Sequence, residues 1–207
     1  METARQPGLQ PFFGGGQVDT ADADLGESEF TGPVPDQGNE LSAVERHALI
    51  VESLVLHSEA ETQQFAAALA AQPALRHAFI ELQGNLGAGK TTLVRHLLHA
   101  LGVAGRIKSP TYAVVEPHEV PGLAIWHFDF YRFSDPREWE DAGFRDIFAS
   151  PGLKLAEWPE KAAALLPPAD LVIRLEVQPD ESRRATLTAQ TATGVALLNG
   201  LKKEMQV

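Results

Sequence analysis

The residues best suited to chemistry form a glycine-rich segment that ends in a lysine and two threonines. This segment, residues 84–92, is the P-loop of this chain and matches the pattern G-x-x-x-x-G-K-[ST]. Its glycines let successive backbone N–H groups turn inward around a phosphate, and a following helix adds the positive end of its dipole. Lys90 can then reach the β- and γ-phosphate oxygens, and the Thr91 hydroxyl can ligate Mg²⁺. The pattern therefore predicts a nucleotide site made of Gly84, Asn85, Leu86, Gly87, Ala88, Gly89, Lys90, Thr91 and Thr92.

The segments on both sides of the P-loop fit this mechanism. Residues 78–82 indicate a short buried strand, and apolar residues at helical spacing follow the loop from Leu93 to Leu101. A strand, a glycine-rich turn and a helix in this order form the setting in which such a loop binds phosphate. The alternative is a glycine-rich turn before an ordinary helix with a solvated Lys90. It accounts for the loop but not for both flanks.

Two acidic residues follow predicted strands and are candidate metal partners. Asp129 follows the strand predicted at 123–128, and Glu157 follows the one at 153–156. In open α/β sheets, ligands bind at the carboxyl ends of the strands. Either acid could hold Mg²⁺, directly or through water, as the second acidic element of a P-loop enzyme. The alternative for each is a carboxylate that caps the next turn or helix, and the sequence leaves open which acid lies nearer the metal.

Three further residues are weaker candidates. Thr111, in Ser109-Pro110-Thr111, could carry a hydroxyl towards Mg²⁺ or the γ-phosphate, although a proline turn is the usual explanation. Trp158 could cover the nucleotide or anchor a partner, or could simply be packed. His127 is two residues from Asp129 on the same strand face, so it could shape that acid.

Composition limits the class of protein. The chain has 207 residues and no cysteine, which excludes disulfides and thiolate zinc sites. No run of about 18 apolar residues and no secretory signal pattern is present, so we expect a cytoplasmic protein that does not enter a membrane. The net charge is −11, of which residues 1–45 carry −8. The remainder is nearly balanced, so strong direct binding of nucleic acid through a basic face is not indicated.

The pattern along the chain predicts a single α/β domain after a disordered extension. Residues 1–48 are acidic and contain glycine and proline with little apolar periodicity, and their role is left open. Residues 49–207 predict a P-loop NTPase-like central β-sheet flanked by helices. Ser58 and Glu61 form a capping box for the first helix. The predicted strands are 52–56, 78–82, 111–116, 123–128, 153–156 and the antiparallel pair 171–177 and 184–189; the predicted helices run from 58 to about 71, from the P-loop to about 102, and over 136–148, 159–166 and 195–203.

Four motifs in this order resemble one known family. They are G-N-L-G-A-G-K-T-T at 84–92, S-P-T-Y at 109–112, H-F-D-F-Y-R at 127–132 and E-W-P-E at 157–160. Their order and spacing are similar to those of the TsaE family, also called YjeE, and the similarity covers roughly residues 52–190. These are bacterial P-loop ATPases of the tRNA threonylcarbamoyladenosine modification system. Four linked motifs are far more specific than a P-loop alone.

The resemblance implies a small Mg²⁺-dependent ATPase that binds ATP and ADP and acts with TsaB and TsaD. The complex of these partners transfers threonylcarbamoyl to adenosine in tRNAs that read codons beginning with A. The family member would contact tRNA only indirectly, through the complex, and its ATP hydrolysis would support repeated turnover. Hydrolysis by the isolated chain would be slow, since partners can complete a phosphoryl-transfer site.

The resemblance also implies roles for individual residues. Thr91 and Glu157 would bind Mg²⁺, with Glu157 the favoured partner, and Thr92 would be a further hydroxyl near the phosphates. The residues implied to be catalytic are Thr92, Asp129, Glu157 and Trp158, and Thr111 and Glu160 would lie near the nucleotide. Two departures stand out. The acidic extension is outside the family pattern, and Asn85 replaces an aspartate of many relatives, which the loop tolerates because it binds through its backbone.

Two other functions remain open. A small-molecule kinase would share the P-loop but would need an arginine-bearing lid, for which Arg132, Arg137 and Arg145 are the candidates in the middle of the chain. A regulatory nucleotide-binding module would bind without useful hydrolysis. The sequence contains no N-K-x-D motif for guanine, no D-x-x-G after the P-loop and no L-S-G-G-Q of transporter ATPases.

Overall fold

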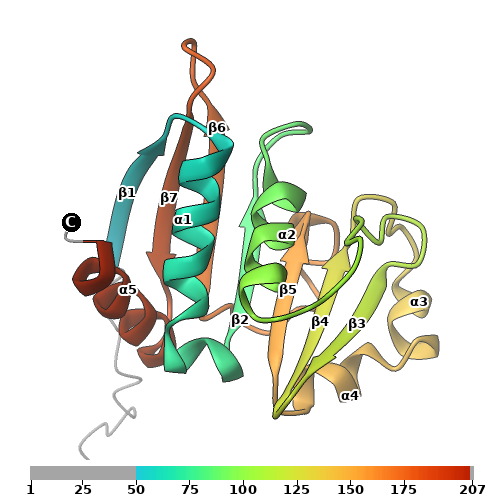
Figure 1. Cartoon of the computed structure of the whole chain (residues 1–207). Helices are drawn as coiled ribbons and strands as arrows, with labels where there is room; N and C mark the ends of the chain where they lie inside the picture. Colours follow the sequence, from blue (N-terminus) through green and yellow to red (C-terminus); the bar gives the residue numbers. More distant parts are fainter. Residues whose placement is uncertain (1–49, 206–207) are drawn as a thin grey trace, which may run out of the picture. The chain divides into compact units, whose positions relative to one another are not determined.

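The computed structural model describes residues 50–205, so the extension predicted over residues 1–48 lies outside the described part of the chain. The side chains of Pro136 and Asp141 are likewise not described. Within these limits the chain folds around one mixed β-sheet with helices on both of its faces (Figure 1). The expected class, a central sheet flanked by helices in one domain, is confirmed.

The sheet has seven strands in the order β1-β7-β6-β2-β5-β4-β3. The central strands β6, β2, β5 and β4 are mutually parallel, and β1, β7 and β3 run antiparallel to their neighbours. The predicted antiparallel pairing of the last two strands is therefore confirmed. The strand bounds are β1 Ile50–Leu56, β2 Phe79–Gln83, β3 Val115–Val120, β4 Leu123–Asp129, β5 Leu153–Glu157, β6 Leu171–Val177 and β7 Arg183–Ala189.

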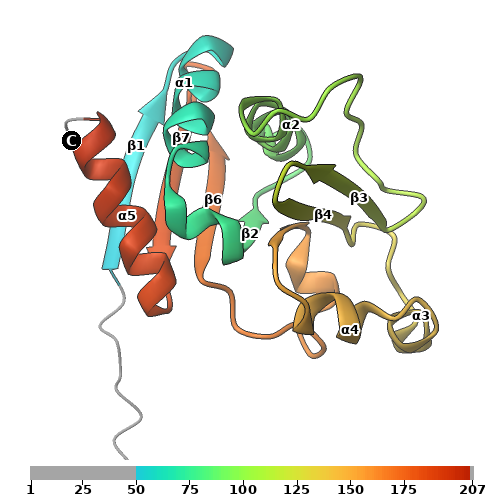
Figure 2. The same ribbon diagram turned by 60° about the horizontal axis from the view of Figure 1, so that its bottom comes forward.

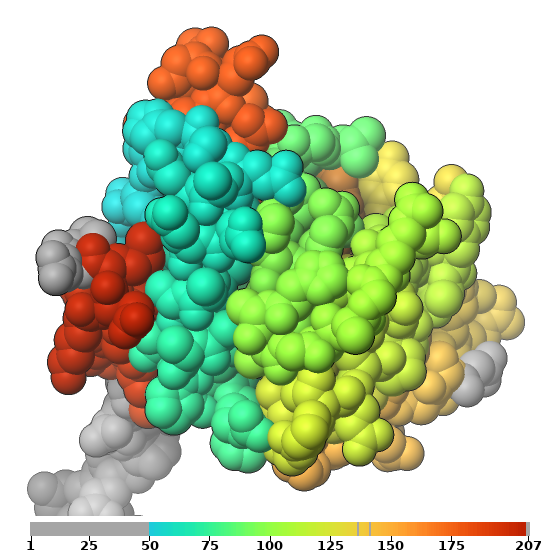
Figure 3. Space-filling view, viewed as in Figure 1, coloured from blue at the N-terminus to red at the C-terminus, as the bar shows by residue number. Residues whose placement is uncertain are grey.

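Helices cover the two faces of the sheet unequally. On one face lie α1, Glu59–Ala70, α2, Lys90–Ala100, and α5, Ala192–Met205 (Figures 1 and 2). The short helices α3, Pro136–Asp141, and α4, Phe144–Ala149, lie on the other. In the space-filling view, α1, α2 and the loop after α2 cover much of the first face (Figure 3).

Alternate residues of the strands pack into two different hydrophobic cores, one on each face of the sheet. On β2, Phe79 packs with an aromatic cluster that includes Phe128, Phe130 and Trp139. The next residue, Ile80, packs on the opposite face into a larger, mainly aliphatic cluster beneath α1, α2 and α5. Successive strand residues point to opposite faces, so one short apolar strand can supply both cores. The sheet is buried on both sides, which holds the strand ends that carry polar residues in fixed places.

Local signals explain where several elements begin and end. The Ser58 hydroxyl accepts the Glu61 N–H at the start of α1, as the capping-box pattern predicts. The Glu61 carboxylate, however, accepts the N–H of His57 at 2.8 Å instead of that of Ser58. A 3₁₀ helix, Pro73–His77, follows α1 and was not predicted.

Two predicted elements were wrong in their bounds. The strand expected at 111–116 is β3, Val115–Val120, because the preceding segment continues as a turn to Val114, whose φ is 65°. β3 contains Pro117, which the sheet tolerates because β3 is an edge strand and the missing N–H costs no ladder bond. The single helix expected over 136–148 is divided into α3 and α4 by Gly143, whose φ of 68° ends the first helix.

Smaller differences occur near the end of the chain. The turns expected over 159–166 contract to a 3₁₀ helix, Pro159–Lys161, and the last helix begins at Ala192 instead of 195. No helix among residues 50–205 is both long enough and apolar enough to cross a membrane.

Candidate nucleotide-binding site

The P-loop connects the carboxyl end of β2 to the start of α2. Gly84, Gly87 and Gly89 have φ values of 139°, 80° and 107°, which disfavour residues with a side chain. A Cβ at Gly84 would also lie 2.3 Å from the backbone oxygen of Leu175 on β6. Gly87 and Gly89 have open space around them, so conformation alone requires glycine there. The loop therefore has the positive φ angles that a phosphate-binding turn requires.

Lys90 begins α2 and turns its ammonium group into the P-loop. Its Nζ donates to the backbone oxygens of Gly84 at 2.6 Å and Asn85 at 3.1 Å, and the residue is 4% exposed. Burial lowers the pKa of Lys90, while the negative charges of Glu157, Glu160 and Asp129 act in the opposite direction. No carboxylate of residues 50–205 forms a direct ion pair with it. A buried cation that accepts no carboxylate partner from these residues and is hydrogen-bonded to carbonyl oxygens is suited to receive an anionic ligand.

Asp129 and Glu157 lie opposite each other at the ends of two parallel strands. They are register partners on β4 and β5, and they are 3% and 2% exposed. The strand ends are tied together by the Phe130 N–H, which donates to the Glu157 backbone oxygen at 3.0 Å. Sequence reasoning placed both acids at strand ends but could not place β4 beside β5.

Glu157 is the acid that reaches the start of α2. Its Oε2 accepts the Thr91 hydroxyl at 2.8 Å, and its Oε1 lies 2.9 Å from Nε2 of His127. His127 is completely buried. The sequence suggested that His127 could shape Asp129; its hydrogen bond goes instead to Glu157, because the neighbouring strand brings that carboxylate within reach.

Asp129 is bound by a different group of donors. Its Oδ2 accepts the hydroxyls of Thr111, at 2.7 Å, and of Ser109, and its Oδ1 accepts the Tyr131 N–H at 3.0 Å. The loop 109–111 is thereby fixed to the end of β4. The two acids thus have separate contacts, since Glu157 binds the P-loop helix and Asp129 binds the loop that follows it.

Lys90, Asp129 and Glu157 line one cavity of about 370 Å³ beside the P-loop. Tyr131 and Ser109 also line it, and sequence reasoning gave neither a role of its own, although both belong to motifs it recognised. Glu160 is exposed and does not line the cavity, although its charge acts on Lys90. The predicted residues among the lining are Leu86, Gly87, Gly89, Lys90, Thr91, Thr92, Thr111, Asp129, Glu157 and Trp158.

Gly84, Asn85 and Ala88 lie away from this cavity, towards β6. They line a separate cavity of about 380 Å³ with Leu175. Gly84 and Asn85 contribute to the site through their backbone carbonyl oxygens, which accept hydrogen bonds from Lys90. Ala88 is buried in the aliphatic core, 1% exposed.

Trp158 joins the cavity to the aromatic core. Its ring centre lies 3.9 Å from Nζ of Lys90 and 5.0 Å from the ring centre of Tyr131. The residue also packs against the aromatic cluster, as the packing alternative expects, and its role towards a nucleotide or a partner stays a prediction. Its φ is 57°, a left-handed conformation that is unfavourable for a bulky residue and that often accompanies functional sites.

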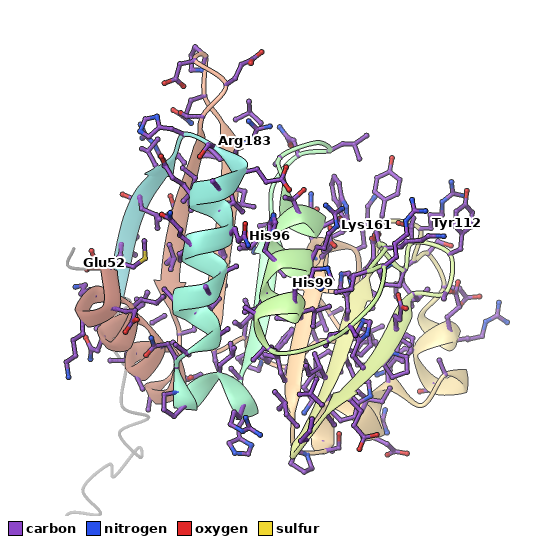
Figure 4. All side chains as sticks on the ribbon, viewed as in Figure 1. Glu52, His96, His99, Tyr112, Lys161 and Arg183 are labelled. Carbon is purple, nitrogen blue, oxygen red and sulfur yellow. The ribbon has the colours of Figure 1, made fainter. Side chains whose placement is uncertain are left out.

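A second cavity of about 250 Å³ lies on the other side of the P-loop. Gly87, Gly89 and Thr92 line both cavities. The remaining walls come from the end of β1, the start of α1, and β6 and β7, where Arg183 lies at the same end of the sheet as the P-loop (Figure 4). No local pattern could have revealed this cavity, because its residues come from four distant segments.

The donor atoms of the first cavity fit a hard cation. Thr91 and Glu157 offer a hydroxyl and a carboxylate oxygen, which are the ligand types that Mg²⁺ prefers. Within residues 50–205 no group of three or more His, Asp or Glu side chains could hold a metal ion. The Thr91 and Glu157 oxygens would form part of an octahedral shell, as in sites where phosphates and water supply the rest.

The fold and this site define a nucleotide-binding protein of the P-loop class with an ATPase-like fold. A glycine-rich loop between a parallel strand and a helix, with its lysine turned inward, is the feature that marks the class. The family model described as "Threonylcarbamoyl adenosine biosynthesis protein TsaE" matches residues 56–186. The chain belongs to the TsaE family.

Individual relatives agree with this assignment. The chain is 43% identical over 120 residues to the tRNA threonylcarbamoyladenosine biosynthesis protein TsaE of Haemophilus influenzae, covering 58% of this chain and 75% of the relative. It is 33% identical over 150 residues to the TsaE protein of Rickettsia felis, covering 72% and 86%. It is 34% identical over 110 residues to the TsaE protein of Bacillus subtilis, covering 53% and 68%.

A solved structure has the same fold. The crystal structure of Bacillus subtilis YdiB superposes with a TM-score of 0.63 and covers 77% of this chain and 99% of YdiB. The sequence identity is 24%, so this likeness supports the fold alone.

Proposed function

We propose that this protein is a Mg²⁺-dependent ATPase that supports the biosynthesis of threonylcarbamoyladenosine in tRNA. The observation that carries the proposal is the 2.8 Å contact between Thr91 and Glu157, next to the ammonium of Lys90 inside the P-loop. A hydroxyl, a carboxylate and a cation at the start of one helix form the set that P-loop enzymes use for Mg²⁺ and triphosphate.

The fit of ATP follows from the two cavities. Backbone N–H groups of the P-loop and the Lys90 ammonium would bind the phosphates, with Thr92 as a further hydroxyl donor. The nucleoside would enter the second cavity, whose lining is partly apolar, past Gly87 and Gly89. Thr91 and Glu157 would hold Mg²⁺, which neutralises charge that develops on the phosphates during transfer.

The remaining predicted residues would organise the transfer. Asp129 holds Thr111 and Ser109 at the edge of the phosphate cavity, so their hydroxyls can respond to a γ-phosphate. Such a loop would be ordered with ATP and released with ADP, as in other nucleotide switches. Trp158 would cover the Lys90 ammonium, since its ring centre lies 3.9 Å from Nζ. Glu160 contributes a negative charge at the rim.

The process is proposed from the family and from the names of the relatives, which place TsaE proteins in tRNA threonylcarbamoyladenosine biosynthesis. On this proposal the chain acts with TsaB and TsaD, meets tRNA only through that complex, and hydrolyses ATP to support repeated turnover. Its net charge of −11 is in keeping with indirect contact to tRNA.

A kinase function receives no support from the arginines that would form its lid. Arg132 lies over the ring of Tyr112 at 4.4 Å, and Arg137 forms an ion pair with Asp135 at 2.7 Å. Arg145 lies 4.0 Å from Glu140. None of the three lines either cavity.

The proposal is tested with the full chain, TsaB, TsaD, tRNA, ATP and Mg²⁺. We expect ATP hydrolysis that EDTA abolishes and the partners accelerate, together with modification that continues beyond one turnover only when this chain is present. Lys90→Ala should remove both effects. Failure to associate with TsaB and TsaD in any nucleotide state would refute the proposed process, and acceptor-dependent phosphoryl transfer to a small molecule would favour a kinase.

A further inference from the structure

We propose that His127 is a positioning residue that fixes the carboxylate of Glu157 for metal binding. The inference rests on the proposed function, because it concerns the acid assigned to Mg²⁺. His127 would donate its Nε2 proton to Oε1 of Glu157, which keeps Oε2 directed at Thr91. His127 itself would touch neither the nucleotide nor the metal.

The sheet register determines which acid His127 can serve. His127 pairs with Leu155 on β5, and Asp129 pairs with Glu157 two residues further along both strands. All four side chains therefore share the face of the sheet that α2 covers. The oxygens of Asp129 are already bound by two hydroxyls and one N–H, whereas Oε1 of Glu157 accepts a hydrogen bond only from His127 among the side chains of residues 50–205.

The position of the proton between His127 and Glu157 follows from the state in which a carboxylate binds a metal. A carboxylate that binds a metal is ionised and only accepts hydrogen bonds, so Nε2 of the imidazole would be the donor in this pair. In the neutral ring, Nδ1 is then an acceptor, and this buried atom has no hydrogen-bond partner in the described part of the chain. An unpaired buried acceptor is unfavourable, and an apolar side chain would avoid it. Packing alone thus gives no reason for histidine here, whereas the bond to Glu157 does.

The consequence is a carboxylate whose orientation is set before a metal arrives. Glu157 is held at Oε1 by a rigid ring on β4 and at Oε2 by the hydroxyl that begins α2. A metal that replaces the Thr91 hydrogen bond would meet an oxygen already turned towards it. Partners of metal ligands in this position change metal affinity by about 10- to 100-fold when they are removed.

The test compares two replacements of nearly equal length. His127→Gln keeps an N–H donor at the end of the side chain, and His127→Met has similar size and flexibility without one. His118→Leu is the control, since His118 is the neighbouring part-buried histidine on β3 and makes no contact with Glu157. Mn²⁺ is titrated into each ADP-saturated full-length protein and followed by electron paramagnetic resonance. ADP affinity in EDTA is measured separately by calorimetry.

We expect His127→Met to weaken Mn²⁺ binding by about 10- to 100-fold while ADP affinity in EDTA stays unchanged. His127→Gln should recover at least part of this loss, and His118→Leu should behave as the unaltered protein. Equal losses in the Gln and Met variants, or no loss in the Met variant, would overturn the positioning role. If the unaltered protein binds Mn²⁺ no better than ADP does alone, the proposed Mg²⁺ site fails first, and the role of His127 fails with it.

Discussion

The Thr91 hydroxyl lies 2.8 Å from a carboxylate oxygen of Glu157, although 66 residues separate them in the chain. Thr91 stands at the first turn of α2, and Glu157 ends β5, which pairs directly with the strand that leads into the P-loop. The pairing of β2 with β5 therefore assembles the two candidate metal ligands. Four predictions follow from this arrangement and from the backbone around it.

Replacing Glu157 should separate nucleotide binding from hydrolysis. Glu157→Gln retains the shape but loses the charge, so we expect ATP to bind while Mg²⁺-dependent hydrolysis falls by about 100-fold or more. Hydrolysis is measured by phosphate release in the presence of partners, and binding by calorimetry. Glu119→Gln, at an exposed acid on the edge strand β3 and outside the cavity, is the control and should lose much less. Unchanged hydrolysis in Glu157→Gln would exclude the proposed role.

Replacing Asp129 should release the loop 109–111. Asp129→Asn removes the charge that accepts the Ser109 and Thr111 hydroxyls, so amide hydrogen exchange in this segment should increase. Hydrolysis should fall by about 100-fold if the loop positions reacting groups. Asp135→Asn, which changes the residue that caps α3 outside the cavity, is the control. Equal exchange in the segment for both variants would contradict the anchoring role of Asp129.

Gly84 should be the least replaceable glycine of the P-loop. Gly84→Ala combines a φ of 139° with a contact of 2.3 Å to the Leu175 oxygen, so the backbone must shift. We expect a loss of about 2–4 kcal/mol in the free energy of unfolding, measured in urea. Gly105→Ala, with a φ of 88° and nothing within 4 Å, should cost only about 1 kcal/mol. Similar losses for both would mean that the approach to β6 is unimportant.

Glu81 gives stability a defined dependence on pH. Burial raises its pKa above the usual 4.5; the hydrogen bond from Gln83 opposes this, and Glu160 adds to it. The folded state thus holds the Glu81 proton more tightly than the unfolded state, so the group's contribution is full below pH 4.5 and is lost as pH rises through the raised pKa. Glu81→Gln should therefore be more stable than the unaltered protein at pH 7, and the difference should shrink below pH 4.5.

Urea unfolding at pH 7 and pH 4 measures this difference. Glu116→Gln is the comparison variant, because Glu116 is also partly buried but lies on the edge strand β3 instead of the central strand β2. A Glu81→Gln variant that is less stable than the unaltered protein at pH 7 would show that its hydrogen bond outweighs its burial.

The sequence predicted an element correctly wherever a few neighbouring residues suffice to determine its conformation. The P-loop glycines, the capping serine of α1 and the apolar runs of β2, β4 and β5 each act over a few residues, and the structure has these elements within a few positions of the prediction. The wrong bounds arose where the tertiary surroundings of a residue determine its conformation. The strand expected to end at residue 116 continues through Pro117, because the sheet edge accepts the proline. Gly143 lies within the helix expected over 136–148, yet it turns the chain there.

By itself the sequence determined the P-loop, the fold class and the presence of acids at two strand ends, because local backbone preference and hydrophobic period specify these. It could not determine that Glu157 faces Thr91, that His127 binds Glu157, or that α1 and β7 line a second cavity. A period of two says which face of a strand a residue occupies, but the strand order decides what lies beside it. That order is set only when the whole sheet forms between its two cores.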